Sequence, residues 1–380
     1  MTDASEQTTH AEHEAVDPPE LTQQDLEELE ASDPEPEVVS YSGSDFDVEG
    51  LARRLERGDI VIPTFGHGLE GIETAGFQRR FVWTRPQMDR FIESLLLGYP
   101  IPGIFLVQQA DRRYLVLDGQ QRLRTLAAFY GGIHDGKQFA LRNVGDGFKG
   151  LTYKALSEDQ RRTLDNTFLQ ATIVKTDGSA ASLDAVYQIF ERLNAGGTQL
   201  TPHEIRVALY AGPFIDFLTR LNRDPNWRSV YGPESPRLRD QELVLRVIAL
   251  YVSPGTYRRP LKKYLNDFVA PHRLMRDFPE NTVMRGFCTA TALLNSENGP
   301  GQAALRSGSR QVNAALTEAV LVGLLRRLDA GSVPEPEAVT EAIKQLHTNS
   351  DLQPAISQAT ADEEAVRTRL AVATQIFASV

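Results

Sequence analysis

The chain has 380 residues, of which 41% are hydrophobic, and a formal net charge of −11. This length allows two domains, or one large domain with a tail. Its single cysteine, Cys288, excludes a disulfide framework and a cysteine-based metal site. No apolar run approaches the roughly 18 residues of a membrane span, and the N-terminus lacks a signal-peptide pattern. We therefore expect a cytoplasmic protein with no membrane partner.

The negative charge is concentrated at the N-terminus. Residues 1–50 contain 16 Asp and Glu and no Lys or Arg, whereas the remaining residues hold 40 basic against 35 acidic side chains. The composition of residues 1–40 predicts a disordered acidic tail. Two interpretations stay open for it. The tail either keeps the protein in solution, or acts as an acidic mimic that competes for a basic groove or docks a partner.

The next segment predicts alternating helices and strands. A helix with Thr84 as N-cap and Pro86 in its first turn ends at Gly98. A glycine-containing loop precedes the stretch Phe77 to Trp83. The expected elements are a helix at 46–57, a strand at 59–63, a helix at 84–98, and strands at 103–109 and 112–117.

The stretch from Tyr114 to Gly132 predicts a strand, a tight turn and a helix. Asp118-Gly119 is a turn dipeptide, and the helix runs from Gln120 to Gly131-Gly132. Its apolar residues recur at helical spacing and predict a core face. That face comprises Leu123, Leu126, Ala127 and Tyr130.

Two charged residues of this turn lie off the core face. Arg122 falls in the first helical turn, beside free backbone N–H groups, where it suits an anion better than it suits helix stability. Asp118 suits a metal ion, or a water molecule that it would orient. The alternative is a surface ion pair between Asp118 and Arg122. The two glutamines beside them favour a phosphate-binding turn.

The following segment predicts a strand at 138–141, a helix at 157–166, a strand at 168–174 and a helix at 183–193. A further helix starts at Thr201-Pro-His-Glu204, where Glu204 either closes a capping box or faces a pocket. Asn194 and Arg206 are candidates for a polar cluster. If Arg206 is buried, it needs an anion, which would be Glu204, Asp118 or a ligand phosphate.

From about residue 239 onward every strong pattern is helical. The basic clusters Arg258–Lys263 and Arg306 with Arg310 are either solvated faces or contacts for DNA phosphate. We therefore divide the chain into an acidic tail at 1–40, a mixed domain at 41–237 and an α-helical domain at 238–380. The expected helices lie at 242–251, 261–268, 282–295, 312–328, 336–347 and 363–378.

Three motifs carry a resemblance to a known family. They are Asp118-Gly-Gln-Gln-Arg122, Phe77-Gln-Arg-Arg-Phe-Val-Trp83, and the run from Phe190 through Asn194 and Glu204 to Arg206. Together they resemble the N-terminal domain of GmrSD-type restriction proteins, the domain of unknown function 262. The resemblance covers roughly residues 50–250. It implies an α+β fold, with a small mixed sheet of the ParB/sulfiredoxin type followed by an all-α lobe.

The resemblance also implies a nucleotide site with Mg²⁺ and an NTP, GTP or another, as cofactors. If the roles of the matching family positions apply here, Asp118, Gln121 and Arg122 would be catalytic, and Asp118 would hold the metal. The residues implied in nucleotide binding are Gln78, Arg79, Gly119, Gln120, Arg122, Thr125, Asn194 and Arg206. Sulfur chemistry is not expected, because glutamines stand where a sulfiredoxin-type activity needs a cysteine.

Three hypotheses for function follow. The first is an NTP-hydrolysing sensor of a restriction or anti-phage system that acts with a separate nuclease, since neither His272 nor His347 lies in a nuclease motif. The second is a ParB-like module that uses the pocket for nucleotide or DNA backbone without turnover. It would recognise modified DNA through Phe77, Trp83 and the basic clusters of the helical lobe. The third is an antitoxin-like or scaffold protein whose acidic tail docks a partner. A homo-oligomer is compatible with each.

Overall fold

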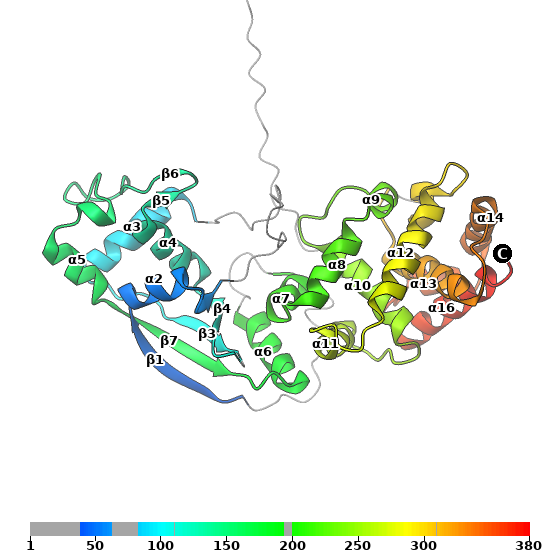
Figure 1. The fold of residues 1–380 in the computed structure, drawn as a ribbon, viewed down its shortest axis with the longest axis horizontal. Helices are drawn as coiled ribbons and strands as arrows, with labels where there is room; N and C mark the ends of the chain where they lie inside the picture. The colour runs from blue at the N-terminus through cyan, green and yellow to red at the C-terminus, as the bar shows by residue number, and fades with distance from the viewer. Residues whose placement is uncertain (1–38, 63–82, 110, 194–199, 309) are drawn as a thin grey trace, which may run out of the picture.

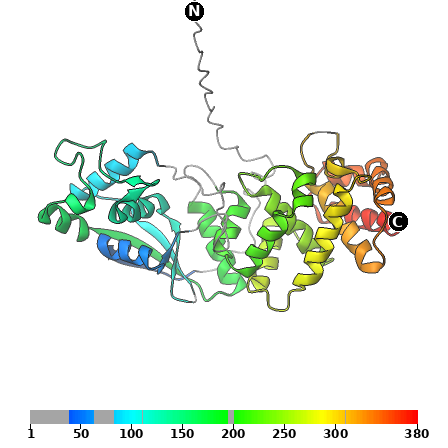
Figure 2. The same cartoon turned by 45° about the horizontal axis from the view of Figure 1, so that its top comes forward.

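The computed structural model describes residues 39–62, 83–109, 111–193, 200–308 and 310–380. Figures 1 and 2 show an elongated arrangement, with a sheet and its covering helices at one end and a long helical region at the other. Among the described residues, no helix is both long enough and apolar enough to cross a lipid bilayer.

A mixed five-stranded sheet organises the first part, in the order β1-β7-β3-β4-β2. Strand β7 pairs antiparallel with β1 and parallel with β3, while β4 pairs antiparallel with β3 and parallel with β2. The strands are β1 (Tyr41–Asp47), β2 (Ile60–Val61), β3 (Ile104–Gln108), β4 (Tyr114–Asp118) and β7 (Phe168–Lys175). A separate two-stranded hairpin consists of β5 (Ile133–His134) and β6 (Lys137–Gln138).

The two faces of the sheet have different covers, because successive side chains of a strand point to opposite sides. One face, with Leu106, Val116 and Ala171, packs with α2 (Val48–Glu56), α3 (Arg85–Leu96), α4 (Gln120–Gly131) and α5 (Glu158–Asp165) in one core. The other face, with Val107, Leu115, Leu117 and Val174, packs with α6 (Ala180–Leu193). The sheet therefore joins both parts of the molecule.

Helices make up the remainder of the chain. Their bounds are α7 (Pro202–Leu209), α8 (Pro213–Asn222), α9 (Pro225–Tyr231), α10 (Arg239–Val252), α11 (Leu261–His272), α12 (Glu280–Asn295), α13 (Ala314–Ala330), α14 (Pro336–Thr348), α15 (Leu352–Ser357) and α16 (Glu363–Phe377). Two 3₁₀ turns, η1 (Tyr153–Ala155) and η2 (Gly301–Leu305), also occur. One continuous buried core extends from the α6 side of the sheet to Phe377 in α16.

The predicted α+β class, a small mixed sheet followed by a helical region, is confirmed. The buried core of the helical region extends back to α6. The predicted boundary between two domains at residue 237 stays a prediction. Several features differ from the expected elements. Residues 46–47 end strand β1 instead of starting a helix, the hairpin β5–β6 replaces a strand at 138–141, and α8, α9 and α15 were not expected.

Candidate functional site

The turn between β4 and α4 depends on one glycine. Gly119 lies in the left-handed region with φ of 93°, a conformation that side-chain-bearing residues rarely adopt. A Cβ at this position would lie 2.4 Å from Cγ2 of Ile104 on the neighbouring strand. The close approach to β3 and the left-handed backbone together require glycine here.

Asp118 and Arg122 form an ion pair across this turn. Nη2 of Arg122 donates to Oδ2 of Asp118 at 2.7 Å, and Nη1 donates to the carbonyl of Pro102 at 2.8 Å. The Arg122 side chain is only 13% exposed, whereas that of Asp118 is 49% exposed. The guanidinium is thus fixed in place, while half of the carboxylate surface remains open to solvent.

The first turn of α4 leaves backbone donors available. The backbone hydrogen bond from Leu123 N–H to the Gly119 carbonyl closes the first helical turn, and no side chain caps the start of α4. The N–H groups of Gln120, Gln121 and Arg122 precede that bond and have no helical acceptor. Such donors at the positive end of a helix dipole favour a negatively charged ligand.

The motif residues divide between two sides of α4. Gln120 and Gln121 stand four and three positions before Arg124, so the three residues share one side of the helix. Arg122 is two positions from Arg124 and therefore lies on roughly the opposite side. The amide oxygen of Gln121 accepts from the backbone N–H of Trp83 at 3.4 Å. Gln121 thereby ties the central motif to the end of the Phe77–Trp83 motif.

Thr125 has a structural position in this helix. Its side chain is fully buried, and its hydroxyl donates to the carbonyl of Gln121 at 2.8 Å. This is a bond from a threonine to the carbonyl four residues before it, which is common inside helices. Thr125 therefore supports the turn that carries Gln121.

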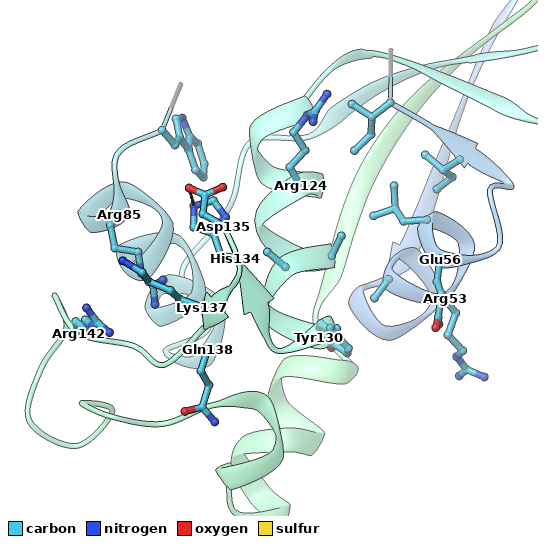
Figure 3. Close-up of a pocket in the computed structure, with 18 residues that line it drawn as sticks. Arg53, Glu56, Arg85, Arg124, Tyr130, His134, Asp135, Lys137, Gln138 and Arg142 are labelled. Atoms are coloured by element: carbon cyan, nitrogen blue, oxygen red, sulfur yellow. Dashed lines mark ion pairs between the residues drawn. The ribbon is translucent and has the colours of Figure 1, made fainter. Parts of the chain in front are cut away.

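A cavity of about 1130 Å³ runs along α4 between α2 and the hairpin β5–β6, and we call it the α4 groove. Small residues of α4 line it, namely Ala127, Ala128 and Gly131. Figure 3 shows Arg124 on the same helix and Lys137 on the hairpin. Its cations are Arg53, Arg85, Arg124, Lys137 and Arg142, and its carboxylates are Glu56 and Asp135. Two of these cations are ion-paired, Arg53 with Glu49 at 3.0 Å and Arg85 with Asp89 at 2.8 Å. The groove lies on the side of α4 that Gln120 and Gln121 share.

The sequence analysis missed this groove. It assigned Ala127 to the core face of the helix, whereas Ala127 is exposed and Phe129 is the buried residue. The sequence pattern that could have indicated the groove is a set of small residues at helical spacing after Arg124, namely Ala127, Ala128 and Gly131.

One buried carboxylate organises the basic wall of the groove. Asp89 is fully buried and pairs with Nε of Arg85 at 2.8 Å. It also accepts from the backbone N–H of Arg142 at 3.2 Å and from that of Asn143 at 3.0 Å. Arg85 additionally lies over the Phe139 ring, 3.9 Å from its centre. Asp89 thus sets the positions of Arg85 and of the loop that carries Arg142.

Arg206 lies apart from the turn at Asp118. It is fully buried in α7, where its Nε donates to Asn266 at 2.9 Å and its Nη2 donates to the carbonyl of Lys262 at 3.3 Å. Its Nη1 lies 3.2 Å from Nδ1 of His203. These partners all belong to the helical region, so the described structure does not bring Arg206 to the central motif.

The charge that accompanies Arg206 is Glu242, which the sequence analysis had not considered. Burial by itself raises the pKa of Glu242, but Arg246, His203 and Arg206 outweigh it and bring this pKa to about 2. Burial lowers the pKa of the neighbouring His203 to about 4. Glu242 is therefore ionised and His203 neutral near pH 7. The buried charges of Glu242, Arg206 and Arg246 therefore compensate one another within the helical core, without a ligand phosphate.

Glu204 closes a capping box, which was the first of the two alternatives that the sequence left open for it. It accepts from the backbone N–H of Thr201 at 2.7 Å and pairs with Arg237 at 3.0 Å. Three other predicted site residues, Gln78, Arg79 and Asn194, lie outside the described residues.

The basic cluster at Arg258–Lys263 is largely occupied by carboxylates. Arg258 and Arg259 pair with Glu363 and Asp362 at 3.9 and 2.5 Å. Lys262 is buried and pairs with Glu191 at 3.2 Å, and Lys263 pairs with Asp267 at 2.9 Å. This pairing favours the interpretation of the cluster as an internally balanced face.

No group of three or more His, Cys, Asp or Glu residues that could hold a metal ion occurs in the described part of the chain. A single half-exposed carboxylate such as Asp118 fits Mg²⁺ only when phosphates and water supply the other ligands. This is the usual arrangement for Mg²⁺ at nucleotide sites. The residues therefore fit a metal that arrives with a nucleotide.

The family comparison agrees with the three motifs. Residues 62–211 match the family model described as the GmrSD restriction endonuclease N-terminal domain. No curated protein and no solved structure shows significant similarity to the chain. The matched segment contains β3, β4, β7, the turn at Gly119 and α4, whereas α2, which lines one side of the α4 groove, precedes it.

Proposed function

We propose that this chain, whose residues 62–211 match the model of the GmrSD restriction endonuclease N-terminal domain, is an NTP-binding and NTP-hydrolysing regulator of a DNA restriction or defence system. In this proposal a separate subunit cuts the DNA. The observation that carries the proposal is the turn at Gly119. There a carboxylate, a fixed guanidinium and the free N–H groups of α4 meet at one helix start.

Each residue of the turn has a role in this proposal. Gly119 places the first N–H groups of α4 where a phosphate would accept from them. Arg122, held by the Pro102 carbonyl, supplies positive charge for the same phosphate. Asp118 would hold Mg²⁺, which when bound neutralises phosphate charge and polarises the bond to be broken.

The two glutamines would act on the other side of the same turn. Gln120 and Gln121 share the groove side of α4, and an amide there is suited to orient either water or a nucleotide base. Gln121 also holds the backbone of Trp83. A change at Gln121 should therefore affect both the turn and the segment that leads to it.

Nucleotide binding tests the proposal directly. We would titrate the protein with GTP and with ATP in Mg²⁺ by calorimetry, using wild type, Asp118→Ala and Arg122→Ala. The matched control is the Asp111/Arg113 pair, an exposed ion pair at 2.7 Å in the loop just before β4. Loss of affinity in Arg122→Ala but not in Arg113→Ala supports the proposal. Equal affinity in all variants, or no binding at all, contradicts it.

A second candidate function is DNA binding without turnover, and the α4 groove favours it. Lys137 and Arg142, exposed at the rim of the groove, suit a phosphate backbone. This candidate predicts DNA affinity that falls steeply with salt, and it predicts no phosphate release from NTP. Weak, salt-insensitive DNA binding would count against it.

A further inference from the structure

Strand β1 is a long, open edge of the sheet. It pairs with β7 on one side, and none of the described strands pairs with its other side. In Figure 1, β1 follows the outer border of the sheet, with no labelled helix or strand beyond it. Its residues 41–45 are all exposed. The strand contains no Lys, Pro or bulge, which are common means of keeping an edge strand from pairing with another chain. The opposite edge, β2, is only two residues long.

The free backbone groups of β1 belong to alternate residues. The backbone N–H of Lys175 in β7 donates to the carbonyl of Ser40 at 3.2 Å. Because the hydrogen-bonding groups of successive residues point to opposite sides of a strand, the even-numbered residues of β1 direct theirs at β7. The N–H and C=O groups of Tyr41, Gly43 and Asp45 therefore point away from the sheet, where they can pair with a further strand.

The two most exposed large apolar side chains of the described residues lie at this edge. Tyr41 is 75% and Phe168 is 68% exposed. Tyr41 pairs with Val174 and Phe168 pairs with Asp47, and paired residues point to the same face of a sheet. Both rings thus lie on the face that carries Val174, beside the open edge. Exposed aromatic side chains of this kind are enriched at protein–protein interfaces.

We propose that β1 pairs antiparallel with β1 of a second copy of this chain, with the twofold axis at Gly43. In this register Gly43 lies opposite Gly43 of the second copy, and Tyr41 lies opposite Asp45 of the second copy. The outward groups of these residues then meet and form about six backbone hydrogen bonds, two for each pair. The two five-stranded sheets become one continuous sheet. This inference does not rest on NTP binding or hydrolysis.

Charge and space favour this register over its neighbours. A twofold axis at Asp45 would place two carboxylates directly opposite each other, which destabilises a strand pair. An axis at Tyr41 would move Asp45 beyond the start of the other strand and leave its outward groups unpaired. At Gly43, an added Cβ would meet no atom within 4 Å, so the position has room for a second backbone.

The two ends of β1 also differ in charge, which favours a second copy as the partner. Asp45 and Asp47 lie in the second half of the strand. Arg112 and Lys175 line a pocket beside its start together with one carboxylate, Asp177, and neither cation forms an ion pair with a described residue. Antiparallel pairing brings the acidic end of each copy near the basic end of the other, at distances on the order of the Debye length of about 10 Å.

Sedimentation of the complete chain tests the proposal. Pairing along one strand edge makes a small interface, so we expect a reversible dimer with a Kd of about 1–100 μM. Gly43→Pro removes an outward N–H but no bond to β7, and it should weaken the dimer at least about tenfold. Gly43→Ala keeps this N–H and should dimerise like wild type. A monomer at all concentrations up to about ten times this Kd range, or a Gly43→Pro dimer as strong as wild type, would overturn the proposal.

Cysteine cross-linking tests the register in a Cys288→Ala background, which removes the native thiol. Gly43→Cys places two Cα atoms about 5.5 Å apart across the dimer, within the range of a disulfide. Asp45→Cys is the matched control, because the two positions would be shifted by about 13 Å along the strands. Gly43→Cys should form the intermolecular disulfide at least about tenfold faster. Equal rates, or a faster reaction of Asp45→Cys, would contradict the proposed pairing, and thermal melts establish that all variants fold.

Discussion

The Asp118 carboxylate is held by the Arg122 guanidinium four residues later, at 2.7 Å, across a left-handed glycine. The pair satisfies the sequence-based alternative of an ion pair across the turn. It also serves the phosphate-binding interpretation, since it fixes a cation beside open helix N–H groups. Measurements of protein stability and of ligand binding distinguish the structural contribution of the ion pair from its contribution to phosphate binding.

The first prediction concerns the stability of this pair. A double-mutant cycle with Asp118→Ala and Arg122→Ala should give a coupling energy of about 0.5 kcal/mol, as for other partly exposed pairs. Urea unfolding of the four proteins measures it. A coupling above about 2 kcal/mol would mean that the pair is mainly structural.

The second prediction concerns Gly119. Gly119→Ala should lower the unfolding free energy by about 2–4 kcal/mol, because it combines a left-handed backbone with a contact to Ile104. Gly132→Ala is the matched control, with φ of 74° and open space around the added Cβ. It should cost only about 1 kcal/mol. Similar losses in both variants would show that the contact with β3 contributes nothing.

The third prediction concerns the buried carboxylate of Asp89. Asp89→Ala should destabilise the protein by about 3–5 kcal/mol, because it leaves Arg85 without its charge partner and frees the loop amides of Arg142 and Asn143. Asp111→Ala, in an exposed pair, should change stability by less than about 1 kcal/mol. Chemical denaturation measures both, and a near-neutral Asp89→Ala would refute the role of Asp89.

The fourth prediction is a pH dependence of stability from His203. Its pKa is about 4 in the folded protein against an ordinary value of 6.5, so the unfolded chain binds the proton more tightly. This contribution is complete above pH 6.5 and is lost as the pH falls toward 4. The slope from this residue approaches about 1.4 kcal/mol per pH unit between the two values.

His203→Gln should therefore flatten the stability curve between pH 6.5 and 4.5, measured by urea unfolding at each pH. An unchanged slope in His203→Gln would show that His203 is not held neutral by burial.

Local signals explain what the sequence predicted well. The capping boxes at Ser157 with Gln160 and at Thr201 with Glu204 involve residues only three apart, and both form at the starts of predicted helices. The strand–turn–helix at Gly119 is equally local. The α+β class, which the family resemblance implied, agrees with these elements.

Long-range pairing explains what the sequence did not predict. Strand β1 has the polar sequence Tyr41-Ser-Gly-Ser-Asp-Phe-Asp47 and is a strand because it pairs with β7, more than 120 residues later. Arg206 finds Asn266 sixty residues away. The α4 groove forms where α2, α4 and a hairpin meet, and no segment alone contains that arrangement.

The measurement that tests the central claim most directly is phosphate release from GTP and ATP with Mg²⁺, without DNA and with plain or modified DNA. The account predicts turnover in wild type and a loss of at least about 100-fold in Asp118→Ala and in Arg122→Ala, with folding intact. Asp111→Ala and Arg113→Ala should retain the wild-type rate. Turnover that survives in Asp118→Ala and Arg122→Ala, or no turnover in wild type under any of these conditions, would contradict the claim that this turn is a hydrolytic nucleotide site.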